Sequence, residues 1–309
     1  DLGHTTLEVG ELAGRRVDVD VIGNVCAADR LSVGGLGALG HGPQPNLALV
    51  ADPIDVQRLT ARLRPEDGWG EVVHLAEVGS TNVEASRRAV LWSPVLADHQ
   101  KAGRGRLERV WEDRPGAALA MSVVVPHLSP PGWLPLAAGL AVRSALVDAG
   151  VDAQLKWPND VLLPRDEDRK VCGILCQSVP DVGAVVGIGI NVAQERADLP
   201  VATATSLRLV GSEVSRTDLA AGVLGHLRRW HEAMAKGGPS AASARRAYEE
   251  ACSTIGRRVV VHRPDGSREE VETTGIDVDG SLRVSGPHGS ATVAAGDVQH
   301  IRLPGPPES

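Results

Sequence analysis

Phenylalanine is absent from this 309-residue chain, tyrosine occurs once, and only four lysines stand against 28 arginines. Long apolar runs are also missing: the run from Ala117 to Pro126 is about half as long as a membrane-spanning helix. The chain does not open with the charged and then apolar segment of a signal peptide. We therefore predict a protein without membrane association that works in the cytoplasm.

The composition also lacks what two classes of binding protein need. Acidic residues outnumber basic ones by 39 to 32, and the first 50 residues hold three arginines, no lysine and six acidic residues, so we expect no nucleic-acid partner. The four cysteines form no Cys-x-x-Cys pair, and no histidine cluster has metal-ligand spacing. We predict buried, reduced thiols rather than a structural metal site or disulfides.

Apolar residues make up 42% of the chain, which is enough for a core, and the length exceeds that of the usual single domain. Residues 1–44 contain nine glycines and little apolar periodicity, so we expect a poorly structured extension. Residues 45–253 alternate strand-like and helix-like runs, and residues 254–304 show five short strands separated by turn signals. This order predicts one large α/β domain, a small β-barrel and a disordered tail at 305–309.

The spacing of apolar residues indicates where the elements lie. Helical stripes are strongest at 133–149, where Gly150 should end the helix, and at 218–234. Ser80 is expected to cap another helix. We predict helices at 53–63, 80–91, 133–149, 218–234 and 240–252, and strands at 72–75, 95–98, 117–126, 154–157, 171–177, 184–192, 258–262, 269–276, 282–285, 291–294 and 298–303.

A loop rich in glycine and arginine follows the second predicted strand. It reads Gly-Arg-Gly-Arg-Leu-Glu-Arg over 103–109, with Gln100 before it. Glycines let a backbone approach a ligand closely, and the guanidinium groups of Arg104, Arg106 and Arg109 can bind carboxylates or phosphates. Taken alone, such a loop is more often a solvated surface loop than a binding site, so evidence for a ligand must come from the other motifs.

The second motif is Leu-Lys-Trp-Pro-Asn-Asp at 155–160. It brings a cation, an aromatic ring, a rigid turn and two short polar side chains together. A strand that ends in a Pro-Asn-Asp turn would explain Pro158 and Asn159 but does not require Lys156. The carboxylate of Asp160 could hold Mg²⁺ or orient a lysine.

Two further strands carry polar residues at their ends. Lys170 leads an apolar strand that contains Gly173, and the run Gly-Ile-Gly-Ile-Asn ends at Asn191. Gly187 and Gly189 point to the same side of a strand and would leave a slot on that face, although close packing against a helix would also explain them. Three of the four lysines lie in these motifs, which indicates a compact charge that arginine cannot replace.

Together these motifs resemble the biotin protein ligase family, also called holocarboxylase synthetases, over about residues 45–304. The matching pieces occur in the family's order: Gly79-Ser80-Thr81-Asn82, Gln100 with the Gly-Arg-Gly-Arg loop, Lys-Trp-Pro-Asn-Asp, Lys170 before Cys-Gly-Ile-Leu, Gly-Ile-Gly-Ile-Asn, and Ala-Thr-Ser-Leu at 204–207. The resemblance implies a mixed, largely antiparallel sheet flanked by helices and a small SH3-like β-barrel. It also implies an enzyme that uses ATP and Mg²⁺ to form biotinyl-5′-AMP and transfers biotin to a lysine of a biotin carboxyl carrier domain of an acyl-CoA carboxylase.

The family's site residues carry over to the matching positions in this chain. The implied catalytic residues are Lys170, Arg104 and Arg106. The implied biotin-binding residues are Ser80, Thr81, Asn82, Gln100, Arg104, Gly105, Arg106 and Lys170. The implied nucleotide-binding residues are Arg109, Trp111, Lys156, Asn159, Asp160, Asn191 and Arg302, and Asp160 is also an implied Mg²⁺ ligand.

Two positions depart from the family's pattern. Glu108 replaces a glycine, so its carboxylate would repel a triphosphate unless it pairs with Arg109 or points outward, and its side chain would stiffen the loop. Cys172 replaces a smaller residue and adds bulk near Lys170. Neither change removes a catalytic charge, so we expect activity to persist.

Three other functions stay open at this point. A lipoate or octanoate ligase or transferase of the same fold superfamily would act on a similar carrier lysine. A bifunctional ligase and repressor would need a DNA-binding domain, which the acidic segment 1–44 does not supply. A non-catalytic biotin-binding protein would not need Lys170. We favour a monofunctional ligase that is a monomer or a weak homodimer.

Overall fold

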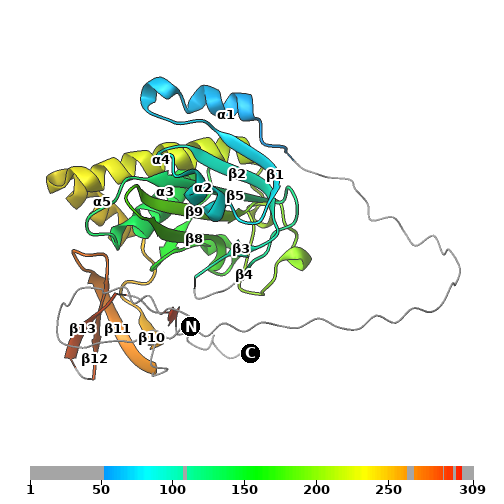
Figure 1. Ribbon diagram of the computed structural model, residues 1–309. Coiled ribbons are helices and arrows are strands. Elements are labelled where there is room, and N and C mark those ends of the chain that lie inside the picture. Colours follow the sequence, from blue (N-terminus) through cyan, green and yellow to red (C-terminus); the bar gives the residue numbers. More distant parts are fainter. Residues whose placement is uncertain (1–51, 107–109, 263–267, 288, 295–296, 301–309) are drawn as a thin grey trace, which may run out of the picture. The chain divides into compact units, whose positions relative to one another are not determined.

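The computed structural model describes residues 52–106, 110–262, 268–287, 289–294 and 297–300, all within one compact unit that spans 47–309. Two main sheets and five α-helices make up the described part of the chain (Figure 1). The predictions for segments 1–44 and 305–309, and those for Glu108, Arg109 and Arg302, lie outside the described residues.

A seven-stranded sheet forms the centre of the larger part. In spatial order its strands are β1 (Val73–Val78), β2 (Pro94–Gln100), β5 (Ala118–Val125), β9 (Gly183–Asn191), β8 (Arg169–Val179), β7 (Asp160–Leu163) and β6 (Gln154–Lys156). Only β1 and β2 run parallel, and every other neighbouring pair is antiparallel. The mixed, largely antiparallel sheet that the family resemblance implied is therefore confirmed.

The helices lie close to their predicted positions. They are α1 (Val56–Arg62), α2 (Thr81–Arg88), α3 (Trp133–Asp148), α4 (Arg216–Lys236) and α5 (Gly238–Ala251). Gly150 follows α3 with φ +76°, the left-handed conformation expected at a helix end. Ser80 occupies the N-cap of α2, but its side chain makes no capping hydrogen bond. The predicted position of the cap is therefore correct, although the capping hydrogen bond is absent.

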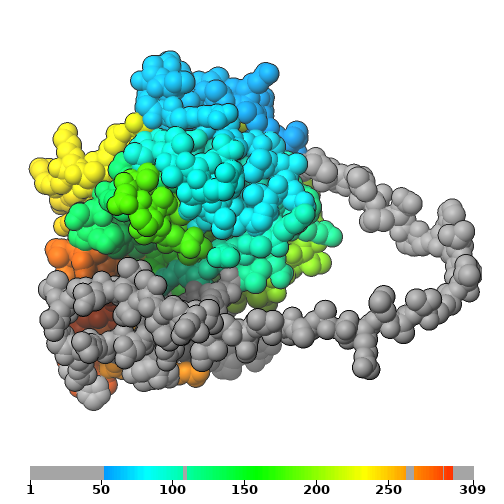
Figure 2. All heavy atoms as spheres, viewed as in Figure 1, coloured from blue at the N-terminus to red at the C-terminus, as the bar shows by residue number. Residues whose placement is uncertain are grey.

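Helices cover both faces of the seven-stranded sheet. Leu96 and Leu119 point into the large core with α3 and α4. Val95, next to Leu96, and Val124, five residues beyond Leu119 on β5, belong to a second apolar cluster, which includes Ala85 of α2. Because successive strand residues face opposite sides of a sheet, α2 lies on the face opposite α3 and α4. In the space-filling view, the cyan segment that contains β1, α2 and β2 forms much of the visible face (Figure 2).

The Lys-Trp-Pro-Asn-Asp motif connects two strands rather than ending one. Lys156 in β6 pairs with Asp160 in β7 across the turn. The sequence reading missed β7, because four residues between a turn and Pro164 are too few for a periodic signal. The resulting hairpin lies at the edge of the sheet, where β6 is the last of the described strands and Leu155 forms an isolated bridge with Cys252.

The C-terminal residues form a five-stranded antiparallel sheet. In spatial order its strands are β13 (Gly289–Val293), β12 (Leu282–Gly286), β11 (Arg268–Ile276), β10 (Arg258–His262) and β14 (Asp297–His300). The first strand, β10, pairs with both the second strand, β11, and the last strand, β14. All five strands were predicted from their alternating residues and turn signals, and their connectivity agrees with the SH3-like piece that the resemblance implied.

Two smaller features complete the fold. The glycine and arginine loop forms a two-stranded ribbon of β3 (Gly103–Arg104) and β4 (Val110–Trp111). No helix in the described part of the chain has the length and apolar character needed to cross a membrane.

Candidate active site

One cavity of about 1110 Å³ brings the predicted site residues together on the α2 face of the sheet. Its walls come from strands β2, β8 and β9, from the start of α2, from the β3–β4 ribbon and from the β6–β7 hairpin. The predicted residues that line it are Ser80, Thr81, Asn82, Gln100, Arg104, Gly105, Arg106, Trp111, Lys156, Asn159, Asp160, Lys170 and Asn191.

Uncharged side chains at the start of α2 form the first part of the site. The side-chain carbonyl of Gln100 accepts hydrogen bonds from the backbone N–H of Thr81 at 2.8 Å and lies 3.0 Å from its hydroxyl. The amide nitrogen of Asn82 donates to Oε1 of Gln177 at 2.9 Å and to the carbonyl of Leu175 at 3.2 Å. These contacts hold the buried side chains of Thr81 and Asn82 in fixed orientations.

Ser122 on β5 completes this group, and the sequence reading missed it. Its hydroxyl lies 2.7 Å from both Oγ1 of Thr81 and Oδ1 of Asn82. Since the amide oxygen of Asn82 can only accept, the single proton of Ser122 goes to Asn82. The one signal in the sequence was a lone hydroxyl within the apolar run 118–125.

The glycines of β9 provide the slot that the sequence predicted. A Cβ atom on Gly187 would overlap the side-chain amide of Asn82. One on Gly189 would lie 2.6 Å from Cε2 of Trp111, and one on Gly173 of the neighbouring strand would lie 3.3 Å from the same indole. The glycines therefore make room for Asn82 and Trp111, and close helix packing is not the reason for them.

Lys170 reaches the cavity because β8 contains a bulge. In its pairing with β7, the register shifts between Lys170 and Cys172, which leaves Val171 as the extra residue. Strict alternation would place Lys170 and Gly173 on opposite faces, yet Nζ of Lys170 lies 3.1 Å from the point where a Cβ of Gly173 would be. Its Nζ also lies 2.7 Å from Oδ1 of Asp160, with both side chains partly exposed to the cavity.

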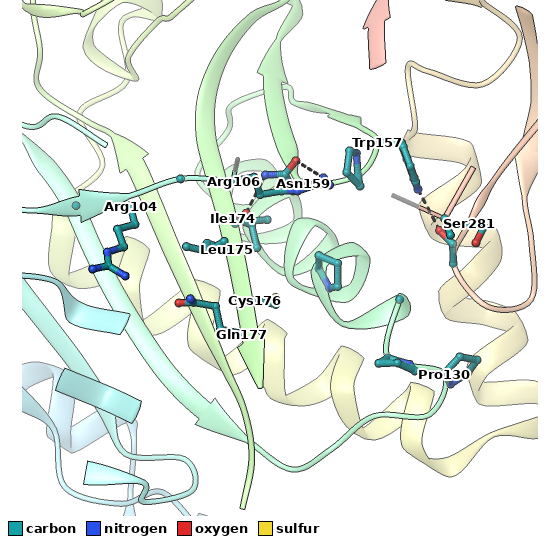
Figure 3. A pocket seen from close by; sticks show the side chains of 18 of the residues that line it. Arg104, Arg106, Pro130, Trp157, Asn159, Ile174, Leu175, Cys176, Gln177 and Ser281 are labelled. Atoms are coloured by element: carbon teal, nitrogen blue, oxygen red, sulfur yellow. Dashed lines mark hydrogen bonds between the residues drawn. The ribbon is translucent and has the colours of Figure 1, made fainter. Parts of the chain in front are cut away.

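Arginine side chains line the cavity from the β3–β4 ribbon. Nη1 of Arg106 donates to Oδ1 of Asn159 at 3.3 Å, and Nδ2 of Asn159 donates to the carbonyl of Ile174 at 2.8 Å. Arg104 is exposed and lies apart from this pair (Figure 3). The segment from Gly103 to Arg106 also lines a second hollow of about 1180 Å³, together with Pro130 and the β11–β12 turn.

An acidic residue anchors the far end of the arginine loop. Oδ1 of Asp113 lies 2.8 Å from Nδ1 of His99 and accepts from the backbone N–H of Gln100 at 3.3 Å. Burial raises the pKa of the Asp113 carboxyl, and the contacts with His99 and Gln100 partly oppose this. The sequence reading missed this pair, because nothing in a single chain shows that positions 99 and 113 meet.

The thiols near the cavity have raised pKa values. Cys172 is fully buried in the large core, and burial raises its pKa far above the usual value. Burial also raises the pKa of Cys176 to about 12, so both thiols are protonated at neutral pH. The expected bulk of Cys172 near Lys170 therefore lies within the core packing and not in the cavity.

The remaining predicted residues have distinct surroundings. Asn191 is buried, donates to the carbonyl of Thr205 at 2.9 Å and accepts from Gln194 at 3.1 Å. The indole N–H of Trp111 is buried and has no hydrogen-bond partner among the described residues. Among the described residues, no three His, Cys, Asp or Glu side chains are grouped so that they could hold a metal ion.

Comparison with known proteins finds relatives along most of the chain. A family model described as the biotin/lipoate A/B protein ligase family matches residues 91–194, which include strands β2 to β9. A biotin–[acetyl-CoA-carboxylase] ligase from Mycobacterium tuberculosis is 33% identical over 268 aligned residues, which cover 81% of this chain and 97% of that protein. A bifunctional ligase/repressor from Bacillus spizizenii is 35% identical over 146 residues, which cover 43% of this chain and 42% of that protein.

A solved structure has the same architecture. The biotin protein ligase from Aquifex aeolicus, in complex with biotin and ATP, superposes with a TM-score of 0.65 at 26% identity. The match covers 76% of this chain and 100% of that chain. Sequence and fold comparisons therefore agree on the same group of proteins.

Proposed function

The chain belongs to the biotin protein ligase family, and we propose that it acts as a biotin–[acetyl-CoA-carboxylase] ligase. In the first step, a carboxylate oxygen of biotin attacks the α-phosphorus of ATP, which forms biotinyl-5′-AMP and releases pyrophosphate. In the second step, a lysine amine of the carboxylase's carrier domain attacks the anhydride carbonyl, loses a proton and displaces AMP. The observation that carries the proposal is a single cavity that joins neutral amide and hydroxyl groups to several cationic side chains.

The neutral part of the cavity suits the ureido ring of biotin. That ring has uncharged donors and acceptors, which the hydroxyl of Thr81 and the amides of Asn82 and Gln100 can match. These side chains already hold one another in place and, with Ser122, form an ordered group. Little ordering is then left to be done when biotin binds, which favours affinity.

The cationic part suits the first chemical step. The biotin carboxylate and the α-phosphate are both negative, so the reaction requires neutralised charge and close positioning more than a protein nucleophile. Lys170, Arg104 and Arg106 line the same cavity and can supply that charge. We assign Lys170 to the oxygens between the two reacting groups, where its ammonium would leave Asp160 and stabilise the transition state.

We assign the nucleotide to the part of the cavity that the β6–β7 hairpin and β8 line. Lys156, Asn159 and Asp160 line it, and the unpaired indole N–H of Trp111 can donate to a ligand oxygen. Mg²⁺ fits here because it takes one or two carboxylates together with phosphate oxygens. Asp160 would supply the carboxylate, and the bound ion would neutralise phosphate charge.

The direct test is transfer of biotin to a carrier domain. The purified chain would be incubated with biotin, Mg-ATP and the biotin carboxyl carrier domain of an acetyl-CoA carboxylase, and the carrier lysine would be examined by intact mass spectrometry. We expect a mass gain with biotin and none with lipoate or octanoate in parallel reactions. Transfer of the fatty acid instead, or formation of neither biotinyl-AMP nor biotinyl-carrier, would overturn the proposal.

A further inference from the structure

Trp157, the aromatic residue of the Lys-Trp-Pro-Asn-Asp motif, is bound to the C-terminal part of the chain. Its side chain is only 2% exposed, and its indole N–H donates to the carbonyl of Gly280 at 3.0 Å (Figure 3). Its backbone N–H donates to the hydroxyl of Thr254 at 3.0 Å. Thr254 lies between α5 and β10, and Gly280 lies in the turn between β11 and β12. One hydrogen bond therefore links the motif to a turn of the second sheet, and the other links it to the segment that leads into that sheet.

The β11–β12 turn is seated closely on the catalytic part of the chain. The indole N–H of Trp133, at the start of α3, donates to the carbonyl of Val278 in the same turn at 2.9 Å. A Cβ on Gly280 would lie 2.7 Å from the carbonyl carbon of Gly132, so the two backbones touch at a pair of glycines. The turn is thus held by two tryptophans, one inside the motif and one outside it.

The hairpin that contains Trp157 needs support from outside its own sheet. It lies at the edge, where β6 is the last strand. The turn residues after Trp157 reach directly into the site: Asn159 accepts from Arg106, and Asp160 contacts Lys170. A shift of this turn would move both contacts. The biotin-binding group around Thr81 lies near the opposite end of the sheet, on β2 and α2.

We infer that Trp157 is a positioning residue that couples the C-terminal sheet to the nucleotide part of the active site. This inference rests on the proposed ligase function. The indole is too deeply buried to stack on a ligand, and its polar atom is already used by Gly280. Its role is to keep the β6–β7 turn in place so that Asn159 and Asp160 meet Arg106 and Lys170. The position of the second sheet therefore affects the formation of biotinyl-AMP through one residue, Trp157.

Trp157→Phe tests the link, because phenylalanine keeps a buried ring but loses the N–H donor. Trp133→Phe is the matched control, since it removes the equivalent hydrogen bond to the same turn without touching the active-site hairpin. Loss of one such hydrogen bond should change an equilibrium by about three- to tenfold. We expect Trp157→Phe to raise the KM for ATP or lower kcat for biotinyl-AMP formation by that factor, with the Kd for biotin alone nearly unchanged. Trp133→Phe should lower the melting temperature to a similar extent but leave the KM for ATP near that of the wild type.

Thr254→Val gives an independent test if Trp157→Phe does not fold. Valine has nearly the shape of threonine, and this change removes the acceptor for the backbone N–H of Trp157 together with a side-chain contact to the buried Cys252. It should reproduce the same separation between ATP and biotin. Two results would overturn the inference. One is an equal effect of Trp157→Phe and Trp133→Phe on every parameter, and the other is an unchanged KM and kcat in both Trp157→Phe and Thr254→Val. Formation of biotinyl-AMP by the wild type in the same assay keeps this outcome distinct from a failure of the proposed function.

Discussion

The ammonium nitrogen of Lys170 lies 2.7 Å from Oδ1 of Asp160, across the pairing of β8 with β7. The lysine is held on the cavity side by the bulge at Val171 and by backbone hydrogen bonds of its own N–H and C=O to Thr203 and Thr205, both at 2.8 Å. Only the flexible side chain is free to move. A cation placed in this way can exchange a carboxylate partner for a ligand oxygen without movement of the strand.

Lys170→Ala should therefore impair the chemical step more than binding. Removal of one preorganised charge from a transition state typically costs about 10²- to 10³-fold in kcat. We expect a loss of that order in pyrophosphate release, with a much smaller change in the Kd for biotin measured by calorimetry. Lys236→Ala, at the exposed end of α4, is the matched control. Wild-type rates in Lys170→Ala would remove this residue from the mechanism.

Ser122→Ala should weaken biotin binding without changing ATP binding. The hydroxyl orders Asn82, and loss of one net hydrogen bond corresponds to about a three- to tenfold weaker Kd. Ser93→Ala is the matched control, because the Ser93 hydroxyl is also buried and donates to the carbonyl of Glu71, away from the cavity. Calorimetric titration of both variants with biotin checks the prediction, and an equal effect in the two would contradict it.

Gly187→Ala should abolish the neutral part of the site. The added methyl group would overlap the Asn82 amide, which would then leave its place beside Ser122 and Gln177. We expect a loss in biotin affinity of more than about tenfold, as the amide's hydrogen bonds are broken together. Gly225→Ala serves as the control, since nothing lies near its Cβ position in α4 and it should stabilise the fold by about 0.5–1 kcal/mol.

Arg257→Ala should raise the KM for ATP. Arg257 lines the cavity from the segment before β10, and its guanidinium lies 3.6 Å from the Asp168 carboxylate, with both side chains well exposed. Such a pair is worth little, so the arginine can turn to a triphosphate at low cost. We expect about a tenfold higher KM, in line with a lost charged hydrogen bond. Arg258→Ala, next in the chain, pairs with Glu270 away from the cavity and should leave the KM unchanged.

Stability should fall in mild acid through His231. Burial lowers its pKa, Arg228 nearby lowers it further, and the contact with the Pro126 carbonyl and the charge of Glu232 partly oppose this. A histidine with a depressed pKa in the folded state contributes stability above its unfolded pKa, near 6.5, and loses it as the pH falls below that value. The free energy of urea unfolding should drop more between about pH 7.5 and 5.5 in the wild type than in His231→Gln. An equal drop in both would exclude His231 as the cause.

Much of the architecture could be predicted from local sequence. Helix α3 and the five C-terminal strands appeared near their expected positions, because apolar periodicity and turn residues such as Gly150 and Gly280 act over short distances. Strand β7 did not, since four residues are too few to show a period. Ser80 was correctly predicted at the N-cap of α2, because that position depends on local sequence, although its side chain makes no capping hydrogen bond.

The chemical types of the residues in the site could also be predicted from the sequence. The slot beside Gly187 and Gly189 was predicted from strand geometry, whereas the position of Lys170 in the cavity depends on the bulge in β8. The side chains that occupy the slot could not be predicted, because Asn82 and Trp111 come from distant segments of the chain. The supporting residues Ser122, Gln177 and Asp113 were missed for the same reason.

The sequence by itself determined most of the elements, the family and the set of charged and neutral groups available for binding, since these depend on residue type and short-range spacing. Tertiary structure alone decided which of those groups meet. A one-residue bulge places Lys170 on the same face of the sheet as Gly173. The indole N–H of Trp157 donates to the carbonyl of Gly280, in a turn of the other sheet, and not to a ligand. Both outcomes depend on contacts between residues far apart in the chain, which the spacing of residues along the sequence does not indicate.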